Sequence, residues 1–312
     1  MITSSNQDKD LTPHDFQISQ VSTSESVKKI ARRIIYPFYT FINNYILKLK
    51  FRSIINHDID KLFLGHRGSD YDALRRKVNS YSHIKGKDIL VIGCGTGRDL
   101  DSWLKYNPRK LVALDLFRYD KAWELMKVKY KELYPSVDIQ FVQQDLNKLN
   151  ITETFDFVVS DAVFEHLRDF DRSIANVANV LKTDGILYAT FGPLWYCWGG
   201  DHIGGKLEHG YNHLLLDDDA YQKHLQNQGD FKHDEGDGRT WIFNDLFSYL
   251  KPSEYMEKLS VVNLEKEYTS GMIEKRALNF KKTYPERFDE LRKKVDEENL
   301  IITGMTTIYR KK

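Results

Sequence analysis

The chain has 312 residues, of which 41% are hydrophobic and 29% are charged, and its formal net charge is +1. That length allows one large core with a smaller cap, while the balanced charge excludes a uniformly basic protein that attracts nucleic acid. The two cysteines, Cys94 and Cys197, exclude a disulfide-built secreted domain and favour a reducing, cytoplasmic compartment.

The N-terminal part divides into a polar tail and a basic, aromatic stretch. Residues 1–24 have no hydrophobic period, which predicts a disordered or loose tail without a secretory signal. Residues 25–84 predict a helical extension. Within it, Lys28–Arg52 has seven basic residues and no acidic one, and its longest charge-free run is 14 residues. A helix that spans a membrane needs about 20 apolar residues, so this stretch is too short to span one. It either docks on the protein's own core or lies peripherally on an anionic membrane.

Residues 85–191 alternate short β-type runs with helical patterns, which predicts βαβ units and a parallel sheet. The β-type runs are rich in Val, Ile, Leu and Phe with little alternation, as is typical of strands covered on both faces. The expected strands are Ile89–Ile92, Leu111–Leu114, Ile139–Val142, Phe157–Ser160 and Ile186–Phe191.

The C-terminal part predicts a lid and the completion of the sheet. Residues 192–250 contain many Gly, His and Asp and no sustained period, which is typical of a functional lid or substrate insertion. Residues 251–312 are expected to finish a seven-stranded, doubly wound and mostly parallel sheet. The elements expected there are a helix at Pro252–Leu259, a strand at Ser260–Glu265, charged helix over residues 271–298 and a last strand at Ile301–Tyr309.

A glycine-rich turn follows the first strand of this core. Gly93, Gly95 and Gly97 allow a sharp turn and close approach of a ligand to the backbone, and the helix that follows offers free N–H groups. Asp115 ends the next strand, where a carboxylate can accept hydrogen bonds from both hydroxyls of a ribose. A dinucleotide site needs a third glycine at the position that Arg98 occupies. The spacing therefore argues against a pyrophosphate ligand such as NAD.

Four segments at strand ends resemble the class I, Rossmann-like methyltransferases that use S-adenosylmethionine. They are the glycine turn with Asp115, Gln144-Asp145-Leu146, Ser160 to Leu167 with Asp161 and Ala162, and Gly185-Ile186-Leu187. A looser likeness of the last residues, Leu300 to Lys311, is to members found among glycan-modifying enzymes.

The resemblance implies S-adenosylmethionine as cofactor and a set of residues around it. It places a residue beside the adenine at Asp145 and brings the segment upstream of the first strand, with Arg67, to the cofactor's carboxylate. Alternative roles are a solvated loop acid for Asp145 and a surface ion pair for Arg67. The full cofactor-binding set is Arg67, Gly93, Cys94, Gly95, Thr96, Gly97, Asp115, Leu116, Asp145, Leu146, Asp161 and Ala162.

Histidines in the lid are candidates for chemistry. His202 follows the exit of the fifth strand, and a histidine near its normal pKa can accept a hydroxyl proton. Alternatively, it only ties the lid to the domain. His209 and His213 have helical i, i+4 spacing, but Gly210 between them makes a helix doubtful. No metal site is therefore expected. Glu165 and His166 are interpreted as a carboxylate at a helix end and a histidine whose ring is hydrogen-bonded within the fold, without a role in catalysis.

These observations predict a methyltransferase that methylates a hydroxyl of a carbohydrate-like or other small-molecule acceptor. The polar lid and the aromatic cluster of Trp195, Tyr196 and Trp198 favour a sugar. Two alternatives stay open: a lipid or quinone acceptor at the membrane surface, and a non-catalytic partner subunit that binds S-adenosylmethionine. Nucleic acid is not expected, because the chain has no motif that reads it.

Overall fold

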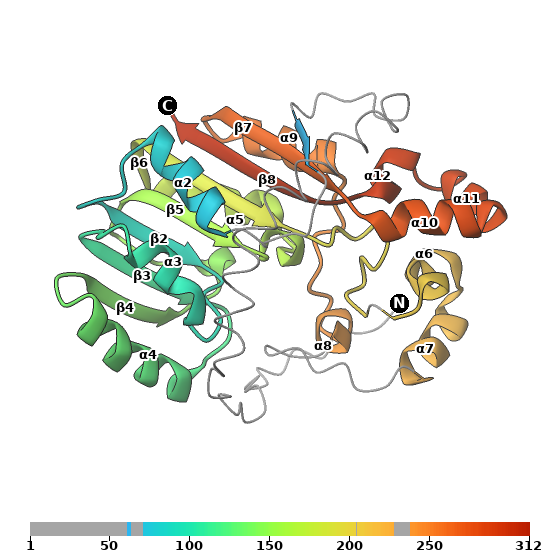
Figure 1. Ribbon diagram of the computed structural model, residues 1–312, viewed down its shortest axis with the longest axis horizontal. Coiled ribbons are helices and arrows are strands. Elements are labelled where there is room, and N and C mark those ends of the chain that lie inside the picture. Colours follow the sequence, from blue (N-terminus) through green and yellow to red (C-terminus); the bar gives the residue numbers. More distant parts are fainter. Residues whose placement is uncertain (1–60, 64–70, 204, 228–237) are drawn as a thin grey trace.

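The computed structural model describes residues 61–63, 71–203, 205–227 and 238–312 (Figure 1). Three sequence-based predictions lie outside the described residues: the tail of residues 1–24, the Lys28–Arg52 stretch and the role of Arg67. Within the described part, no helix is both long and apolar enough to cross a membrane.

The core is one sheet with the strand order β1-β7-β8-β6-β5-β2-β3-β4. Neighbouring strands from β6 to β4 in this order run parallel, while β8 is antiparallel to both β6 and β7. The prediction of a doubly wound, mostly parallel sheet is confirmed. The strand bounds are β1 (Lys61–Phe63), β2 (Asp88–Ile92), β3 (Lys110–Asp115), β4 (Asp138–Gln143), β5 (Phe155–Asp161), β6 (Leu181–Phe191), β7 (Leu264–Ile273) and β8 (Ile302–Lys311).

The strand count differs from the expected seven because β1 adds an eighth strand at one edge. It lies in the segment that was expected to be helical, and it pairs in parallel with β7. The difference arises because three residues are too few for a β-type pattern to stand out in the sequence.

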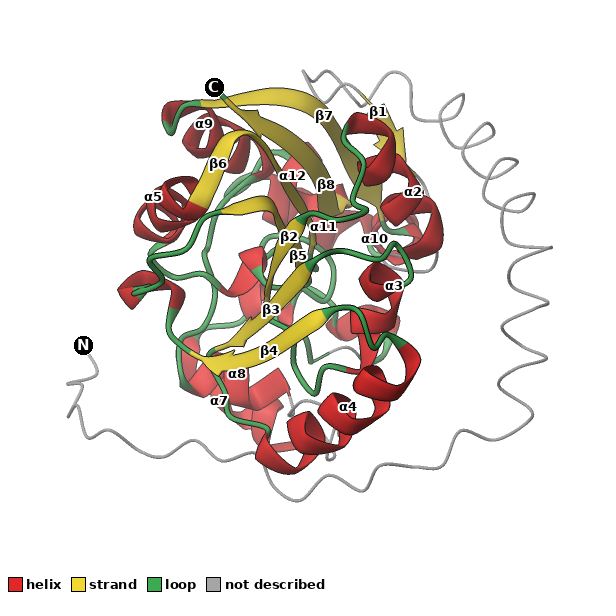
Figure 2. Ribbon diagram, turned by 90° about the vertical axis from the view of Figure 1, so that its left-hand side faces the viewer, coloured by secondary structure: helices red, strands yellow, loops and turns green. Residues whose placement is uncertain are grey.

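Both faces of the sheet are covered by helices, as Figure 2 shows. Ile89 and Val91 of β2 pack toward α2, α3 and α4, whereas Leu90 and Ile92 pack toward α5 and α9. Because successive side chains of a strand point to opposite faces, a strand buried on both sides reads as a continuous apolar run. The helices are α2 (Tyr71–Tyr81), α3 (Asp101–Leu104), α4 (Asp120–Leu133), α5 (Phe170–Val180) and α9 (Pro252–Val261).

The remaining α-helices form a cap at one end of the sheet, on the right in Figure 1. Arg287 donates hydrogen bonds to the Glu208 carbonyl (2.8 Å) and to Asn212 (3.1 Å), and Tyr211 donates to the Leu300 carbonyl (2.6 Å). The lid and the helices between β7 and β8 are therefore one packed unit. Its helices are α6 (Asn212–Leu215), α7 (Asp218–Asn227), α8 (Gly238–Phe243), α10 (Lys275–Thr283), α11 (Pro285–Arg292) and α12 (Glu297–Ile301).

Two expected elements in the C-terminal part have different bounds. The charged helix expected over residues 271–298 is three short helices, because Pro285 cannot continue α10 and instead begins α11. The strand expected at Ser260–Glu265 begins at Leu264 and runs to Ile273, since α9 extends to Val261.

Candidate active site

The glycine turn joins β2 to the short helices that follow it. Gly93, Gly95 and Gly97 all have positive φ angles, of 69°, 52° and 81°. The backbone N–H groups of Gly93 and Cys94 both donate to the Leu114 carbonyl on β3, at 2.7 and 3.0 Å. The turn is therefore fixed against the neighbouring strand, and the left-handed conformations explain why glycine occupies these positions.

Asp115 ends β3 directly beside this turn and is 7% exposed. Its two carboxylate oxygens accept hydrogen bonds from the N–H groups of Gly95 (2.7 Å) and Phe117 (2.9 Å). Burial nevertheless raises the pKa of Asp115 to about 6. Each carboxylate oxygen has a second lone pair, so the group can still accept hydrogen bonds from a ligand.

Asp145 follows β4 and begins a short 3-10 helix, where its carboxylate accepts from the N–H of Asn147 (2.8 Å). Leu146 next to it is buried, whereas Leu116, after β3, is 43% exposed. An acceptor and two apolar side chains thus lie at the ends of neighbouring strands, a combination suited to a purine ring with an exocyclic amine.

Asp161 at the end of β5 is paired with a buried arginine that no sequence pattern predicts. The guanidinium of Arg75, on α2, donates to both oxygens of Asp161, at 3.1 and 2.5 Å. Arg75 is 1% exposed and lies over the ring of Trp103, 3.9 Å from its centroid, and it also bonds the hydroxyl of Tyr188. This ion pair fixes the carboxylate at the centre of the sheet.

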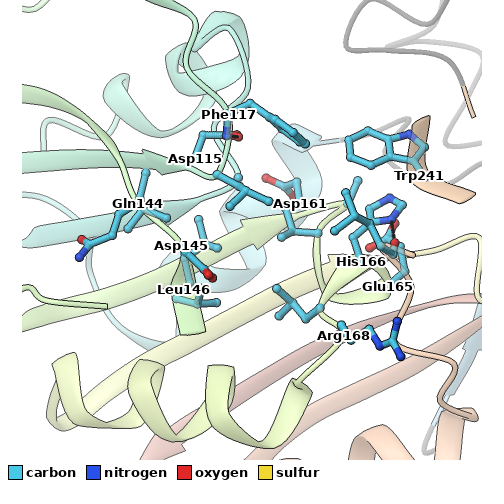
Figure 3. A pocket seen from close by; sticks show the side chains of 18 of the residues that line it. Asp115, Phe117, Gln144, Asp145, Leu146, Asp161, Glu165, His166, Arg168 and Trp241 are labelled. Carbon is cyan, nitrogen blue, oxygen red and sulfur yellow. Dashed lines mark hydrogen bonds between the residues drawn. The ribbon is translucent and has the colours of Figure 1, made fainter. Parts of the chain in front are cut away.

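These strand ends open onto one cavity of about 480 Å³, within the range of small-molecule sites. It lies where the chain order reverses, between β2 and β5, which is where open α/β sheets bind ligands. In Figure 3, Asp115, Gln144, Asp145 and Leu146 lie on one side of the cavity, and Glu165, His166, Arg168 and Trp241 lie on the other. We call these the cofactor half and the acceptor half, after the roles that the sequence predicts for them, with Asp161 between them.

Segments after β5 and from the cap form the acceptor half. His166 stacks on Trp241, with ring centroids 4.6 Å apart, and its Nδ1 lies 2.8 Å from the Leu246 carbonyl oxygen. Glu165 is 1% exposed, and its carboxylate accepts from the N–H of Gly192 (2.8 Å) after β6. Arg168 forms an ion pair with Asp245.

His202 also lines this cavity. Its ring packs edge-on against His166, with centroids 4.8 Å apart, and its Nε2 lies 3.1 Å from the Pro193 carbonyl oxygen. The φ angle of His202 is 61°, and that of Ala162, also at the cavity, is 58°. Non-glycine residues in this left-handed region are uncommon and concentrate at functional sites.

The predicted cofactor residues divide into two groups. Gly93, Asp115, Leu116, Asp145, Leu146, Asp161 and Ala162 line the cavity. Cys94, Gly95, Thr96 and Gly97 do not line it. Two of them are bonded to α4: the indole N–H of Trp123 donates to the Gly95 carbonyl (2.8 Å), and the Tyr130 hydroxyl donates to that of Gly97 (2.9 Å). Roles in binding stay a prediction for both groups.

The aromatic cluster of the lid lies away from the cavity. Trp195 packs against His213, Phe247 and Tyr249, and the indole N–H of buried Trp198 donates to the Leu207 carbonyl (3.0 Å). Neither these two rings nor Tyr196 line the cavity. In this structure the cluster belongs to the packing of the cap, whereas Trp241 and Phe117 supply aromatic rings to the cavity.

Asp201 does not orient His202. Its carboxylate accepts from the Tyr221 hydroxyl (2.9 Å) and lies 3.7 Å from Nδ1 of His213. His213 is fully buried, which lowers its pKa, and its Nε2 contacts the Trp195 carbonyl at 2.7 Å. His209 instead packs against His224. The two histidines with i, i+4 spacing thus serve separate contacts within the cap.

Comparisons with known proteins show what the part of the chain around this cavity is similar to. Residues 90–189 match the family model described as a methyltransferase domain. The chain is 33% identical over 111 residues to the malonyl-[acyl-carrier protein] O-methyltransferase of Halalkalibacterium halodurans, which covers 34% of this chain and 39% of that protein. It is 28% identical over 137 residues to the ubiquinone biosynthesis O-methyltransferase of Bartonella bacilliformis, with 43% and 53% covered.

Among solved structures, an S-adenosylmethionine dependent methyltransferase from Mesorhizobium loti aligns over 78% of this chain and 97% of that one, with a TM-score of 0.47 and 16% identity. The chain spans about two fifths of the length of the first curated relatives that it matches. The matched segment contains β2 to β6 almost entirely, and with them the strand ends of the cavity. Residues 90–189, which contain these strand ends, are therefore similar to a methyltransferase domain.

Proposed function

We propose that the chain transfers a methyl group from S-adenosylmethionine to a hydroxyl of a small-molecule acceptor. The observation that carries this proposal is the single cavity with two chemically different halves. One half has carboxylates at strand ends and apolar side chains. The other has imidazole, guanidinium and indole groups. Both curated relatives named above are O-methyltransferases, which supports an oxygen acceptor.

The cofactor half has the groups that an adenosine needs. Asp115 can accept from the ribose hydroxyls, and Asp145 can accept from the adenine amine. Leu116 and Leu146 would offer apolar surface to the adenine ring. When bound, S-adenosylmethionine supplies an electrophilic methyl group on a sulfonium.

The acceptor half has to position a hydroxyl oxygen about 3 Å from the methyl carbon and to exclude water. The oxygen forms the new bond to carbon, the electron pair of the S–C bond goes to sulfur, and the hydroxyl proton has to leave. His202 as the base that takes this proton stays a prediction. Its test is His202→Asn, in which a base role requires intact cofactor binding with turnover reduced about a hundredfold or more.

A carbohydrate-like acceptor is the first candidate, because the rings of Trp241 and Phe117 line the cavity together with Arg168 and Glu165. Aromatic faces beside charged and polar groups suit a hydroxylated ring. A quinone-like acceptor is the second candidate, and the likeness to the ubiquinone biosynthesis O-methyltransferase favours it.

The function is tested with labelled S-adenosylmethionine and cell extract, followed by mass spectrometry of the labelled species. We expect a labelled small molecule, and much less label with an Asp115→Ala variant at the same concentration of S-adenosylmethionine. Calorimetry on the same preparations should show binding of S-adenosylhomocysteine and no binding of NAD. Binding without any transfer would favour the non-catalytic partner subunit, and tight NAD binding alone would contradict the proposal.

A further inference from the structure

We propose that Glu165, His166 and His202 form a binding site for one divalent transition-metal ion of the zinc class. One carboxylate oxygen of Glu165 and one ring nitrogen from each histidine all lie within 4.8 Å of one another. All three residues line the acceptor half of the cavity. Two imidazoles with one carboxylate are a ligand set typical of catalytic zinc, which keeps a position open for substrate.

The carbonyl contacts of the two histidines indicate which ring nitrogen of each one carries the proton. His166 Nδ1 lies 2.8 Å from the Leu246 carbonyl oxygen, and His202 Nε2 lies 3.1 Å from the Pro193 carbonyl oxygen. A carbonyl only accepts, so each of these nitrogens carries the proton. In a neutral imidazole the other nitrogen then has a lone pair: Nε2 of His166 and Nδ1 of His202. Metal-binding histidines are commonly held in this way by a backbone carbonyl.

The backbone holds the three residues together from segments far apart in the sequence. The Gly192 N–H donates to the carboxylate of Glu165, and the Ser248 N–H donates to its carbonyl (2.9 Å). The strands that precede Glu165 and His202, β5 and β6, are neighbours in the sheet, with Asp161 opposite Thr190. The ligand set is therefore fixed by the sheet and by the 246–248 segment, so that little ordering is needed when an ion binds.

The histidines of the cap have different contacts. His213 is held by the Trp195 carbonyl and lies beside Asp201, while His209 and His224 form a ring contact. Within the described ranges, the Glu165 group is the one cluster of at least three potential ligands. The histidines of the cap therefore serve as internal controls.

The role of the ion rests on the proposed function. An ion at this position would face the acceptor and lower the pKa of its hydroxyl, so that the proton can pass to solvent before or during methyl transfer. His202 would then hold the ion through Nδ1 and could not act as the general base. The two roles exclude each other, and metal binding separates them.

The experiment measures Zn²⁺ binding by calorimetry on full-length protein that has been dialysed against a chelator. We expect one Zn²⁺ per chain, and visible absorption bands when Co²⁺ is used instead. Glu165→Gln, His166→Asn and His202→Asn should each weaken Zn²⁺ binding by about tenfold or more, since even the loss of a supporting partner costs that much. Asn suits the left-handed φ at position 202, and Gln keeps an oxygen to accept from Gly192.

Two control variants and a second ligand make the result decisive. His83→Ala removes an exposed histidine remote from the cavity, and a His209→Ala/His224→Ala double variant removes the ring pair of the cap. Both should bind one Zn²⁺ with unchanged affinity. Loss of binding in the double variant alone, or unchanged affinity in all three ligand variants, would overturn the proposal. S-adenosylhomocysteine affinity should stay unchanged in the ligand variants that keep the wild-type melting temperature, so that failure of the metal site and failure of the proposed function are distinguishable.

Discussion

The two halves of the cavity differ in how the chain builds them. The cofactor half consists of residues directly after consecutive parallel strands, so that Asp115 and Asp145 come together because β3 and β4 are neighbours. The acceptor half combines a segment after β5, a residue of the lid and the indole of Trp241 on α8. The first half follows from sheet topology, whereas the second depends on packing of the cap.

This difference has an energetic consequence. Groups in the cofactor half are bonded to the backbone of adjacent strands, as Gly93 is to Leu114. Groups in the acceptor half are bonded to cap segments, as His166 is to Leu246. We therefore expect substitutions in the first half to affect cofactor binding and those in the second half to affect acceptor or metal binding.

The largest effect is expected at the boundary between the halves. Arg75→Met should lower the free energy of unfolding by about 3–5 kcal/mol, because it leaves the carboxylate of Asp161 next to the core without its charged partner. The loss also removes the stacking of the guanidinium on Trp103. Arg76→Met, one position along the same helix but exposed, is the matched control and should change stability by less than about 0.5 kcal/mol. Urea unfolding measures both, and equal losses in the two variants would show that the ion pair is not the cause.

Arg75 also shows where inference from the sequence ends. The strands of the core were predictable because each is an apolar run closed by a polar residue, and Asp115 and Asp145 could be placed at their ends for the same reason. Nothing in the sequence around Arg75 distinguishes it from Arg76. A buried arginine is recognised by its partners, and Trp103, Asp161 and Tyr188 are brought to it only by the tertiary fold.

The next effect concerns the cofactor half alone. Asp115→Ala should weaken S-adenosylhomocysteine binding by about 1.5–3 kcal/mol, the scale of hydrogen bonds to a charged group. Zn²⁺ binding in the acceptor half should not change. Asp120→Ala, which removes an exposed carboxylate at the start of α4, is the control and should leave both affinities unaltered. Calorimetry measures both ligands, and an unchanged affinity in Asp115→Ala would remove this residue from the site.

A smaller effect is expected from pH, because burial raises the pKa of Asp115 to about 6. Ribose hydroxyls donate best to the carboxylate, so protonation of Asp115 should weaken cofactor binding. S-adenosylhomocysteine affinity should fall below pH 6, by up to about tenfold per pH unit, and this dependence should be absent in Asp115→Asn. Calorimetry at pH 7.5, 6 and 5 checks it; parallel profiles for the two proteins would contradict it.

Without ligand, the pH dependence of folding stability should have the opposite sign to that of cofactor affinity. The pKa of Asp115 in the folded state is raised above its unfolded value, so its contribution to stability is complete below about pH 4 and is lost as pH rises through 6. As pH rises through this window, the wild type should therefore lose stability relative to Asp115→Asn, which has no carboxyl group to titrate at this position. Acid should therefore raise the stability of the unbound protein and lower its affinity for the cofactor.

The acceptor half was less predictable for a physical reason. Glu165 and His166 follow β5 in the sequence. Their position at the start of a helix led to the interpretation that they only form hydrogen bonds with the backbone. They do contact the backbone at Gly192 and Leu246. The sequence could not show that the same contacts bring both residues to His202, because that requires the packing of three segments that share no periodic pattern.

The smallest expected effect is the difference in stability between two glycine variants. It distinguishes a residue that supports the site from one that contacts the ligand. Gly86 and Gly97 both have positive φ, of 73° and 81°. A Cβ at Gly86 would meet nothing within 4 Å, whereas one at Gly97 would lie 2.6 Å from the ring of Phe141. That ring stacks on Trp123, whose indole N–H bonds the Gly95 carbonyl. Gly86→Ala should cost about 1 kcal/mol of stability from backbone strain alone. Gly97→Ala should cost about 1 kcal/mol more, because Phe141 and Trp123 must shift.

Since Gly97 does not line the cavity, the affinity of the folded protein for S-adenosylhomocysteine should fall less than in Asp115→Ala. Thermal unfolding and calorimetry measure the two quantities. Equal stability of the variants would mean that the ring yields without cost, and a loss of affinity as large as that of Asp115→Ala would place Gly97 in contact with the cofactor.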